Sequence, residues 1–238
     1  MLKFTKAEEI SSTLKRLARE YTETLILAVL IALFLRTFVF SLVRVNNVTM
    51  APTLFSGDVA IAYKFPFSKF ASDKLNSLQR GQILLFECPG VKDRRCVSRL
   101  MGLPGDEIII HQGKITLNGK ELNYSEILSL DEEWKAQPNF DRFVFYKEMF
   151  PQGKNGHEVL VSKMGSLEPQ RFVVPPGEVF FLGDHRAIQE DSRKWGTIKI
   201  KRIVAQVTAV FVSFRWPLDP SENQWLPSLR MHRFMHAL

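Results

Sequence analysis

Thr49-Met50-Ala51-Pro52-Thr53-Leu54 is the stretch from which the organisation of this chain can be worked out. It begins a few residues after a long apolar segment and leads through Phe55-Ser56-Gly57-Asp58 into an alternating segment at 59–63. A proline flanked by small residues, between an apolar anchor and a strand, predicts a rigid extended turn. An ordinary turn at the start of a strand would look the same, so the surrounding segments must decide its meaning.

The apolar segment at 22–43 predicts a transmembrane anchor. Residues 25–35 are uninterrupted apolar sequence, and apolar character resumes at 38–43 after Arg36. About 20 residues cross the hydrocarbon core, and Arg36 can extend its side chain toward the nearer interface. Five Lys and Arg residues precede the segment. They predict a cytoplasmic segment at 1–21 and an extracytoplasmic domain at 44–238. A cleaved signal peptide is the alternative, but Val-Arg-Val at 43–45 is a poor cleavage site, which favours a retained anchor.

Composition bounds the partners of the chain. With 238 residues, it can fold one good-sized domain beyond the anchor. Its net charge of +7 suits an anionic membrane surface as well as nucleic acid. The basic residues are scattered and no nucleic-acid motif is recognisable, so we expect the lipid bilayer, and no nucleic acid, as a partner.

Beyond the anchor, the pattern is mainly β. Short strands are predicted at 59–63, 82–86, 107–110, 114–117, 171–174, 179–182 and 204–214. Asn118-Gly119 predicts a tight hairpin turn, and the Gly and Pro turns indicate an antiparallel domain. Residues 120–170 are weakly patterned and predict a smaller inserted subdomain at about 112–172. Phe65, Phe67 and Phe70 fit either the core or an apolar patch on the bilayer.

The cysteines and histidines suggest no metal or other cofactor. Cys88 and Cys96 flank a charged turn, so a cross-hairpin disulfide and two unpaired thiols both remain open. Without neighbouring histidines, they make no zinc site. His232 and His236 would share one face of a helix, as metal ligands can, but no third ligand accompanies them.

Two further blocks complete a family resemblance. One is Ser-Arg-Leu-Met-Gly-Leu-Pro-Gly-Asp at 98–106, and the other begins with Gly-Asp-His-Arg at 183–186 and continues at 191–196. Together with the turn at 49–54, behind an amino-terminal anchor, they resemble bacterial type I signal peptidases of the Gram-negative type. The resemblance covers almost the whole chain. It implies a signal-peptidase-like antiparallel β domain in the periplasm, anchored in the bacterial inner (cytoplasmic) membrane, that acts on the signal peptides of exported proteins.

The resemblance also implies a role for each position of the site. Such enzymes use a serine nucleophile and a lysine base, whose pKa an apolar site lowers toward neutrality. The nucleophile position holds Thr49, the base position Ser98, the oxyanion position Asn47 and the base-orienting position Gln189. His185 replaces an asparagine and is the candidate alternative base, because imidazole titrates in the right range. The framework positions retain the family residues: Met50, Pro52, Arg99, Asp184, Arg186, Asp191 and Arg193.

The substitutions favour a protein without peptidase activity. Thr49 keeps a hydroxyl, although its β-branch restricts the side chain. Ser98 cannot take a proton near neutral pH, and a general base is worth about 10²–10⁴-fold in rate. We therefore expect a protein that binds exported precursor proteins or signal peptides in an extended groove. Two alternatives stay open: an active serine/threonine-type endopeptidase using Thr49 with a base other than lysine, and an inert assembly partner.

Overall fold

The computed structural model describes residues 19, 21–64, 74–91, 93–128, 140–151, 156–165, 168–215 and 227–238. The chain divides into two compact units, Met1–Ser41 and Leu42–Leu238, and each is described by itself. Phe65, Phe67 and Phe70, for which the sequence predicted a core or a membrane role, lie outside the described residues.

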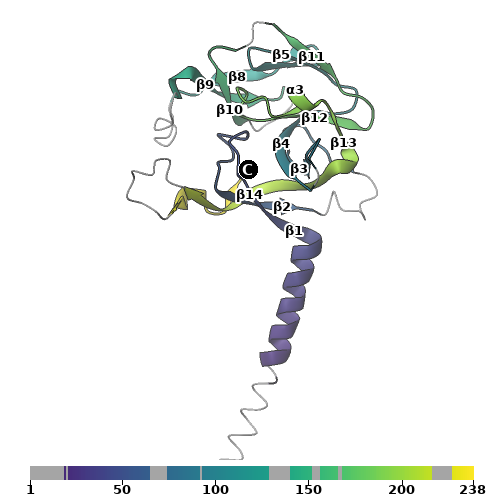
Figure 1. Ribbon diagram of the computed structural model, residues 1–238, viewed down its shortest axis with the longest axis vertical. Helices are drawn as coiled ribbons and strands as arrows, with labels where there is room; N and C mark the ends of the chain where they lie inside the picture. Colours follow the sequence, from purple (N-terminus) through teal and green to yellow (C-terminus); the bar gives the residue numbers. More distant parts are fainter. Residues whose placement is uncertain are drawn as a thin grey trace, which may run out of the picture. The chain divides into compact units, whose positions relative to one another are not determined.

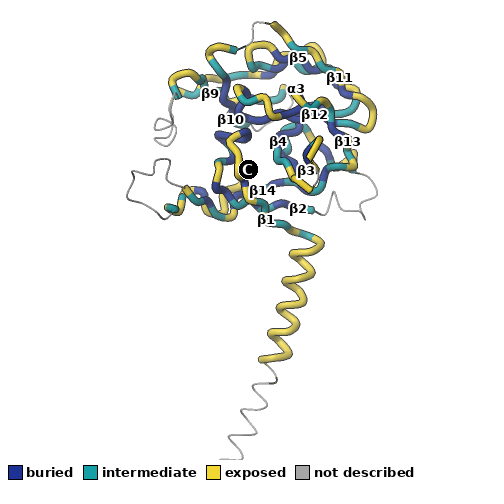
Figure 2. Tube along the Cα trace, viewed as in Figure 1, coloured by how far each residue is buried: buried dark blue, intermediate teal, exposed yellow. Residues whose placement is uncertain are grey.

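The amino-terminal unit contains one apolar helix, Tyr21–Val39, whose length and composition suit a membrane crossing. Its last five residues, Leu35–Val39 (η1), form a π-helical turn. The helix is exposed along almost its entire length (Figure 2). It is shorter than the predicted span of 22–43, because Phe40–Arg44 forms strand β1.

The larger unit is built around a nine-stranded antiparallel sheet with the order β1-β2-β14-β3-β4-β12-β13, and β15 and β16 also pair with β14. Its strands after β1 are β2 (Asp58–Tyr63), β3 (Ile83–Glu87), β4 (Arg95–Gly102), β12 (Glu178–Leu182), β13 (Ile198–Lys199), β14 (Ile203–Arg215), β15 (Ser228–Leu229) and β16 (His236–Ala237). The predicted mainly β, antiparallel fold is confirmed.

Two smaller sheets complete the unit. A four-stranded sheet contains β11 (Gln170–Val173), β5 (Glu107–His111), β6 (Lys114–Leu117) and β7 (Lys120–Glu121), and a three-stranded sheet contains β10 (His157–Ser162), β9 (Phe143–Met149) and β8 (Asn123–Glu126). In Figure 1, β5, β8, β9 and β11 lie on one side of this unit, and β2 and β14 on the other. The short helices are η3 (Phe140–Arg142), α3 (Ser192–Trp195), η4 (Ile200–Arg202) and η5 (Met231–Arg233).

The sequence predicted the turn between β6 and β7 but not the strands that follow it. Asn118 and Gly119 have φ of 50° and 77° and join β6 to β7 in a two-residue hairpin, as predicted. The weakly patterned region at 120–170 contains strands β7 to β10, which the sequence did not predict.

Three apolar clusters form the core, and β4 contributes to all of them. Val97 packs against the first cluster, Leu100 belongs to the second, and Met101 belongs to the third. Successive side chains of a strand point to opposite faces. Val97 and Met101 therefore lie on one face of β4, and Leu100 lies on the other. The second cluster contains Phe86 stacked on Phe181, with ring centroids 4.3 Å apart.

A disulfide joins Cys88 to Cys96, which decides between the two states that the sequence left open. Cys96 lies opposite Phe86 in the β3–β4 pair, next to the closing pair Glu87–Arg95. The bridge therefore closes the β3–β4 hairpin at its turn.

Candidate active site

The stretch at 49–54 is a hydrogen-bonded turn whose apolar side chains are buried in the core. Ala51 N donates to Val48 O at 3.1 Å and Leu54 N to Met50 O at 2.8 Å, so the turn is folded rather than extended as predicted. Met50 and Leu54 are fully buried in the first core cluster. The Ala51–Pro52 peptide is cis. The two hydrogen bonds and the buried Met50 and Leu54 side chains fix the backbone of the turn on the domain.

Thr49 and Asn47, at the nucleophile and oxyanion positions, contact each other directly. The Thr49 hydroxyl donates a hydrogen bond to Asn47 Oδ1 at 3.0 Å. Thr49 is 8% exposed, and Asn47 is exposed. An amide oxygen accepts hydrogen bonds but does not act as a base near neutral pH. In this arrangement, the Thr49 hydroxyl keeps its proton.

Ser98, at the base position, is buried on an apolar face of β4. It is 1% exposed and lies opposite Leu84 of β3. The alternation along β4 places Leu100 on the same face, and Leu84, Leu100 and Phe86 all belong to the second core cluster. These surroundings would lower the pKa of an amine through burial, but a serine hydroxyl there has no proton-accepting role.

His185 contacts the turn through its backbone. Its N–H donates to Thr49 O at 3.1 Å. The imidazole ring meets Phe143 edge-on at 5.2 Å, and its Nδ1 is buried without a hydrogen-bond partner among the described residues. Burial lowers the pKa of His185 to about 4, and the positive charge of Arg193 adds to the effect. The ring is therefore neutral at pH 7 and is a weak base.

Gly183 lets the same turn approach Thr49 closely. A Cβ atom at residue 183 would lie 2.4 Å from Thr49 O, so any side chain there would displace the Thr49 backbone.

Gln189, at the base-orienting position, is exposed, whereas Ser98 is buried. It lies beside a pocket of about 170 Å³ that Arg186 and Arg193 also line, and Ser98 and Thr49 do not belong to that lining.

Arg99 and Asp184 link β4 to the turn after β12. Arg99 Nε and Nη2 lie 2.7 and 2.6 Å from the two oxygens of Asp184, and Arg99 Nη1 donates to Gly81 O at 2.6 Å. The Thr53 hydroxyl donates to Asp184 Oδ2 at 2.5 Å. Burial opposes ionisation of Asp184, but Arg99 and these donors hold its pKa below the ordinary value.

Arg186 forms a second buried ion pair, with Glu148 of β9. Its Nη1 and Nη2 lie 2.9 and 2.7 Å from the two carboxylate oxygens, and Tyr124 donates to Glu148 Oε2 at 2.5 Å. Although burial works against the charged form, Arg186 holds the pKa of Glu148 far below its ordinary value. This pair joins the three-stranded sheet to the 183–186 turn, and the backbone adds Leu160 N to Asp184 O at 2.9 Å.

His157 of β10 lies between these two ion pairs. Its Nε2 is 3.0 Å from Glu148 Oε1 and 4.0 Å from Asp184 Oδ1, although the geometry to Glu148 is not that of a hydrogen bond. Burial lowers the pKa of His157, and Arg99 lowers it further. Neither His157 nor Glu148 was predicted from the sequence as a site residue. Neither lies in a recognised motif, and only the fold brings them to the framework.

Arg193 and Asp191 shape the chain from 183 to 193. Arg193 Nε and Nη2 lie 2.9 and 2.7 Å from Asp191, and Asp191 also accepts from Gly183 N at 3.1 Å. Arg193 Nη1 donates to Arg186 O at 2.7 Å. The retained framework residues therefore brace the turn that supports Thr49. They do not provide a base for its hydroxyl.

His232 and His236 do not share a helix face. His232 lies in η5 and His236 in β16, because the chain turns between them. Both residues line a large groove on the Arg99 side of β4, which Pro52 and Thr53 line but Thr49 does not.

Comparisons with known proteins agree on one family. A family model described as "Signal peptidase, peptidase S26" matches residues 18–212. Signal peptidase I of Haemophilus influenzae is 25% identical over 93% of this chain and 76% of its own length. Signal peptidase I of Rickettsia bellii is 25% identical over 99% of this chain and 90% of its own length. Signal peptidase I of Bacillus caldolyticus is 33% identical over 80% of this chain and 87% of its own length.

Among solved structures, a crystal structure of a signal peptidase I from Enterococcus faecalis matches 55% of this chain and 97% of its own chain. The sequence identity is 26% and the TM-score is 0.32. The family model covers most of the sequence, including every position of the candidate site. The chain therefore belongs to the signal peptidase family, peptidase S26.

Proposed function

We propose that this protein binds exported precursor proteins or signal peptides without cutting them. The observation that carries the proposal is the hydrogen bond from the Thr49 hydroxyl to Asn47 Oδ1. Neither that amide nor the Ser98 hydroxyl can take a proton at neutral pH, and an unactivated hydroxyl is a weak nucleophile. The retained ion pairs support this reading, since they brace the fold and contribute no base.

The strand edges near the turn provide a place for an extended peptide. β1 is the end strand of the main sheet. β3 pairs with β4 from Arg95 to Arg99, whereas in the described registers β12 meets β4 only from Arg99 to Gly102. Arg95 is exposed and Cys96 and Val97 are partly exposed, so the β12 side of residues 95–97 offers main-chain hydrogen bonds, which give affinity in β-augmentation.

The proposal includes a location. The basic flank before the helix favours a cytoplasmic amino terminus and a periplasmic domain at the bacterial inner membrane. The Cys88–Cys96 disulfide supports an oxidising compartment. Protease added outside the inner membrane should degrade the domain, and protection from that protease would contradict the orientation.

Cleavage and binding of one precursor test the proposal together. Detergent-solubilised protein and its Thr49→Ala variant are incubated with a signal-peptide-bearing precursor, and both cleavage and binding are measured. We expect no cleavage by either protein and equal binding by both. Cleavage that disappears in Thr49→Ala would overturn the proposal, and the absence of binding would favour an inert assembly partner.

The second candidate is an active endopeptidase that uses Thr49 as nucleophile and His185 as base. The observation in its favour is that His185 is neutral and hydrogen-bonded through its backbone to Thr49. A pKa of about 4 makes it a poor base, because the best catalytic pKa lies near the working pH. Cleavage abolished by His185→Ala as well as by Thr49→Ala would establish this candidate.

A further inference from the structure

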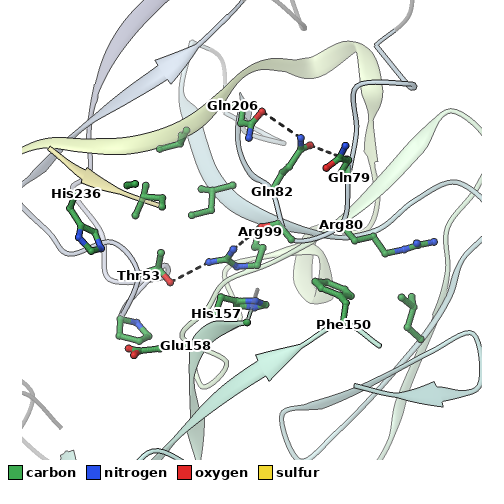
Figure 3. A pocket seen from close by; sticks show the side chains of 18 of the residues that line it. Thr53, Gln79, Arg80, Gln82, Arg99, Phe150, His157, Glu158, Gln206 and His236 are labelled. Atoms are coloured by element: carbon green, nitrogen blue, oxygen red, sulfur yellow. Dashed lines mark hydrogen bonds between the residues drawn. The ribbon is translucent and has the colours of Figure 1, made fainter. Parts of the chain in front are cut away.

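A groove of about 1670 Å³ crosses the Arg99 side of β4. The turn after Thr49 supplies Pro52 and Thr53 to its lining, and β14 supplies Gln206 and Val207. Figure 3 shows Thr53, Arg99 and His157 at its centre, with Gln79, Gln82 and Gln206 along one side. Small-molecule sites usually measure about 300–1,000 Å³, so the groove is large enough for a longer ligand.

The charged side chains of the groove are largely neutralised by the protein itself. Arg99 is paired with Asp184, Arg80 Nη2 lies 2.7 Å from Asp106, and Arg233 Nη2 lies 2.8 Å from Asp58. The remaining lining residues of formal charge, Lys120 and Glu158, are exposed and opposite in sign. The groove therefore has little net charge with which to attract a phosphate or another strongly anionic ligand.

Three glutamines give the groove an uncharged polar surface. Gln82 Nε2 donates to Ser77 O at 3.3 Å and to Gln206 Oε1 at 3.4 Å, both longer than ordinary hydrogen bonds. Gln82 Oε1 also accepts from Gln79 N at 3.0 Å, so the Gln82 amide is engaged within the protein. A side-chain amide such as that of the exposed Gln79 offers donors and acceptors that match a peptide group. Ile83, Val207 and Phe150 place apolar surface beside them. This combination fits an extended polypeptide with uncharged polar side chains.

We propose that this groove binds the polar segment of an exported precursor that directly follows its signal peptide. The inference rests on the proposed function, in which the signal peptide itself is bound near Thr49. A signal peptide consists of a basic start, an apolar core and small residues at its end. If the small residues at the end of the signal peptide lie near Thr49, the apolar core and the basic start lie on one side of Thr49. The polar chain on the other side is the precursor segment that follows the signal peptide. Pro52 and Thr53 place the groove next to that position.

Two fluorescent peptides test the inference. Both contain the same signal peptide; the first ends at its last small residue, and the second continues with a short run of Ser, Thr, Asn and Gln. Their Kd values are measured by anisotropy with the detergent-solubilised full chain. We expect the longer peptide to bind about tenfold more tightly, as a few added hydrogen bonds would allow. Gln82→Ala with Gln206→Ala should remove this advantage, and Asn123→Ala, at an exposed amide outside the groove, should preserve it.

The outcomes separate this inference from the proposed function. Equal binding of both peptides to the unchanged protein overturns the groove assignment alone, whereas no binding of either peptide overturns the proposed function and the inference with it. If the double variant loses its melting transition, Gln79→Lys at an exposed position replaces it. That variant should weaken binding of an extension containing Lys and strengthen binding of one containing Asp. An unchanged preference would also overturn the assignment.

Discussion

Arg99 and Asp184 form a buried two-point ion pair, with side chains only 7% and 0% exposed. The pair joins two of the three segments that carry the altered site positions, because Arg99 follows Ser98 and Asp184 precedes His185. Thr53, from the third segment, hydrogen-bonds to both partners. The pair therefore has a structural role that does not depend on which residues occupy the neighbouring predicted site positions.

Asp184→Asn should destabilise the fold strongly. The change leaves the buried Arg99 guanidinium without its counter-charge, and breaking such a pair costs about 3–5 kcal/mol. Urea unfolding followed by tryptophan fluorescence measures the loss. Glu190→Gln is the matched control, because Glu190 pairs with Lys194 at the surface and the change should leave the free energy of unfolding almost unaltered. Equal effects of the two variants would contradict the structural role of the buried pair.

The sequence predicted those parts of the fold whose signals are local. Short apolar segments located β2, β5 and β12 to within a residue or two, and Asn118-Gly119 identified a hairpin turn. The helix ends at Val39, before the end of the predicted span at 43, because apolar residues after Arg36 suit an edge strand as well as a helix. Hydropathy alone does not separate these two conformations.

The missed features depend on long-range pairing. Strand β9 buries Glu148 completely, which breaks the apolar alternation by which strands are recognised. Its partner Arg186 is 38 residues away, and His157 comes from a third segment. Motif spacing located the framework residues, but it could not place Ser98 among the side chains of Leu84 and Leu100. The catalytic or binding roles of Thr49, Ser98, Asn47, Gln189 and His185 remain predictions.

Restoring the family dyad should create cleavage activity. In Thr49→Ser with Ser98→Lys, the new amine lies on the apolar face of β4, where burial lowers its pKa toward neutrality. A general base contributes about 10²–10⁴-fold, so we expect precursor cleavage to rise by at least about 10²-fold over the unchanged protein. Gel analysis of a precursor over time measures it. Thr49→Ala with Ser98→Lys, which has the base but no hydroxyl, should stay inactive. A folded dyad variant that binds the precursor and does not cleave it would show that other positions also disable the site.

His185 should make the folded protein less stable as the pH falls from about 6.5 to 4. Its pKa is lowered from 6.5 to about 4, so in this window the unfolded chain binds a proton that the folded protein does not. Above pH 6.5 both forms are neutral, and His185 adds no pH dependence. Linkage gives a loss of up to about 1.4 kcal/mol per pH unit from this group.

His185→Asn tests this dependence, because asparagine has no proton to gain. Urea unfolding between pH 7.5 and 4.5 should show a smaller loss of stability in the variant. Some loss should persist, since the lowered pKa of His157 acts in the same direction. Asn123→Ala, at an exposed position of β8 that does not titrate, is the control and should retain the original slope. An unchanged slope in His185→Asn would exclude His185 as a source of the dependence.

Removing the disulfide should weaken the β3–β4 hairpin. Cys88 and Cys96 are separated by 8 residues, and loop-closure entropy for a loop of this size gives about 2–3 kcal/mol of stabilisation. Cys88→Ser with Cys96→Ser should lower the free energy of unfolding by about that amount, and a reductant should do the same to the unchanged protein. The reductant should leave the double variant unaffected. If the hairpin also positions the β12 side of residues 95–97 for a peptide, precursor binding should weaken together with stability. Loss of stability with full precursor binding would place the binding edge elsewhere.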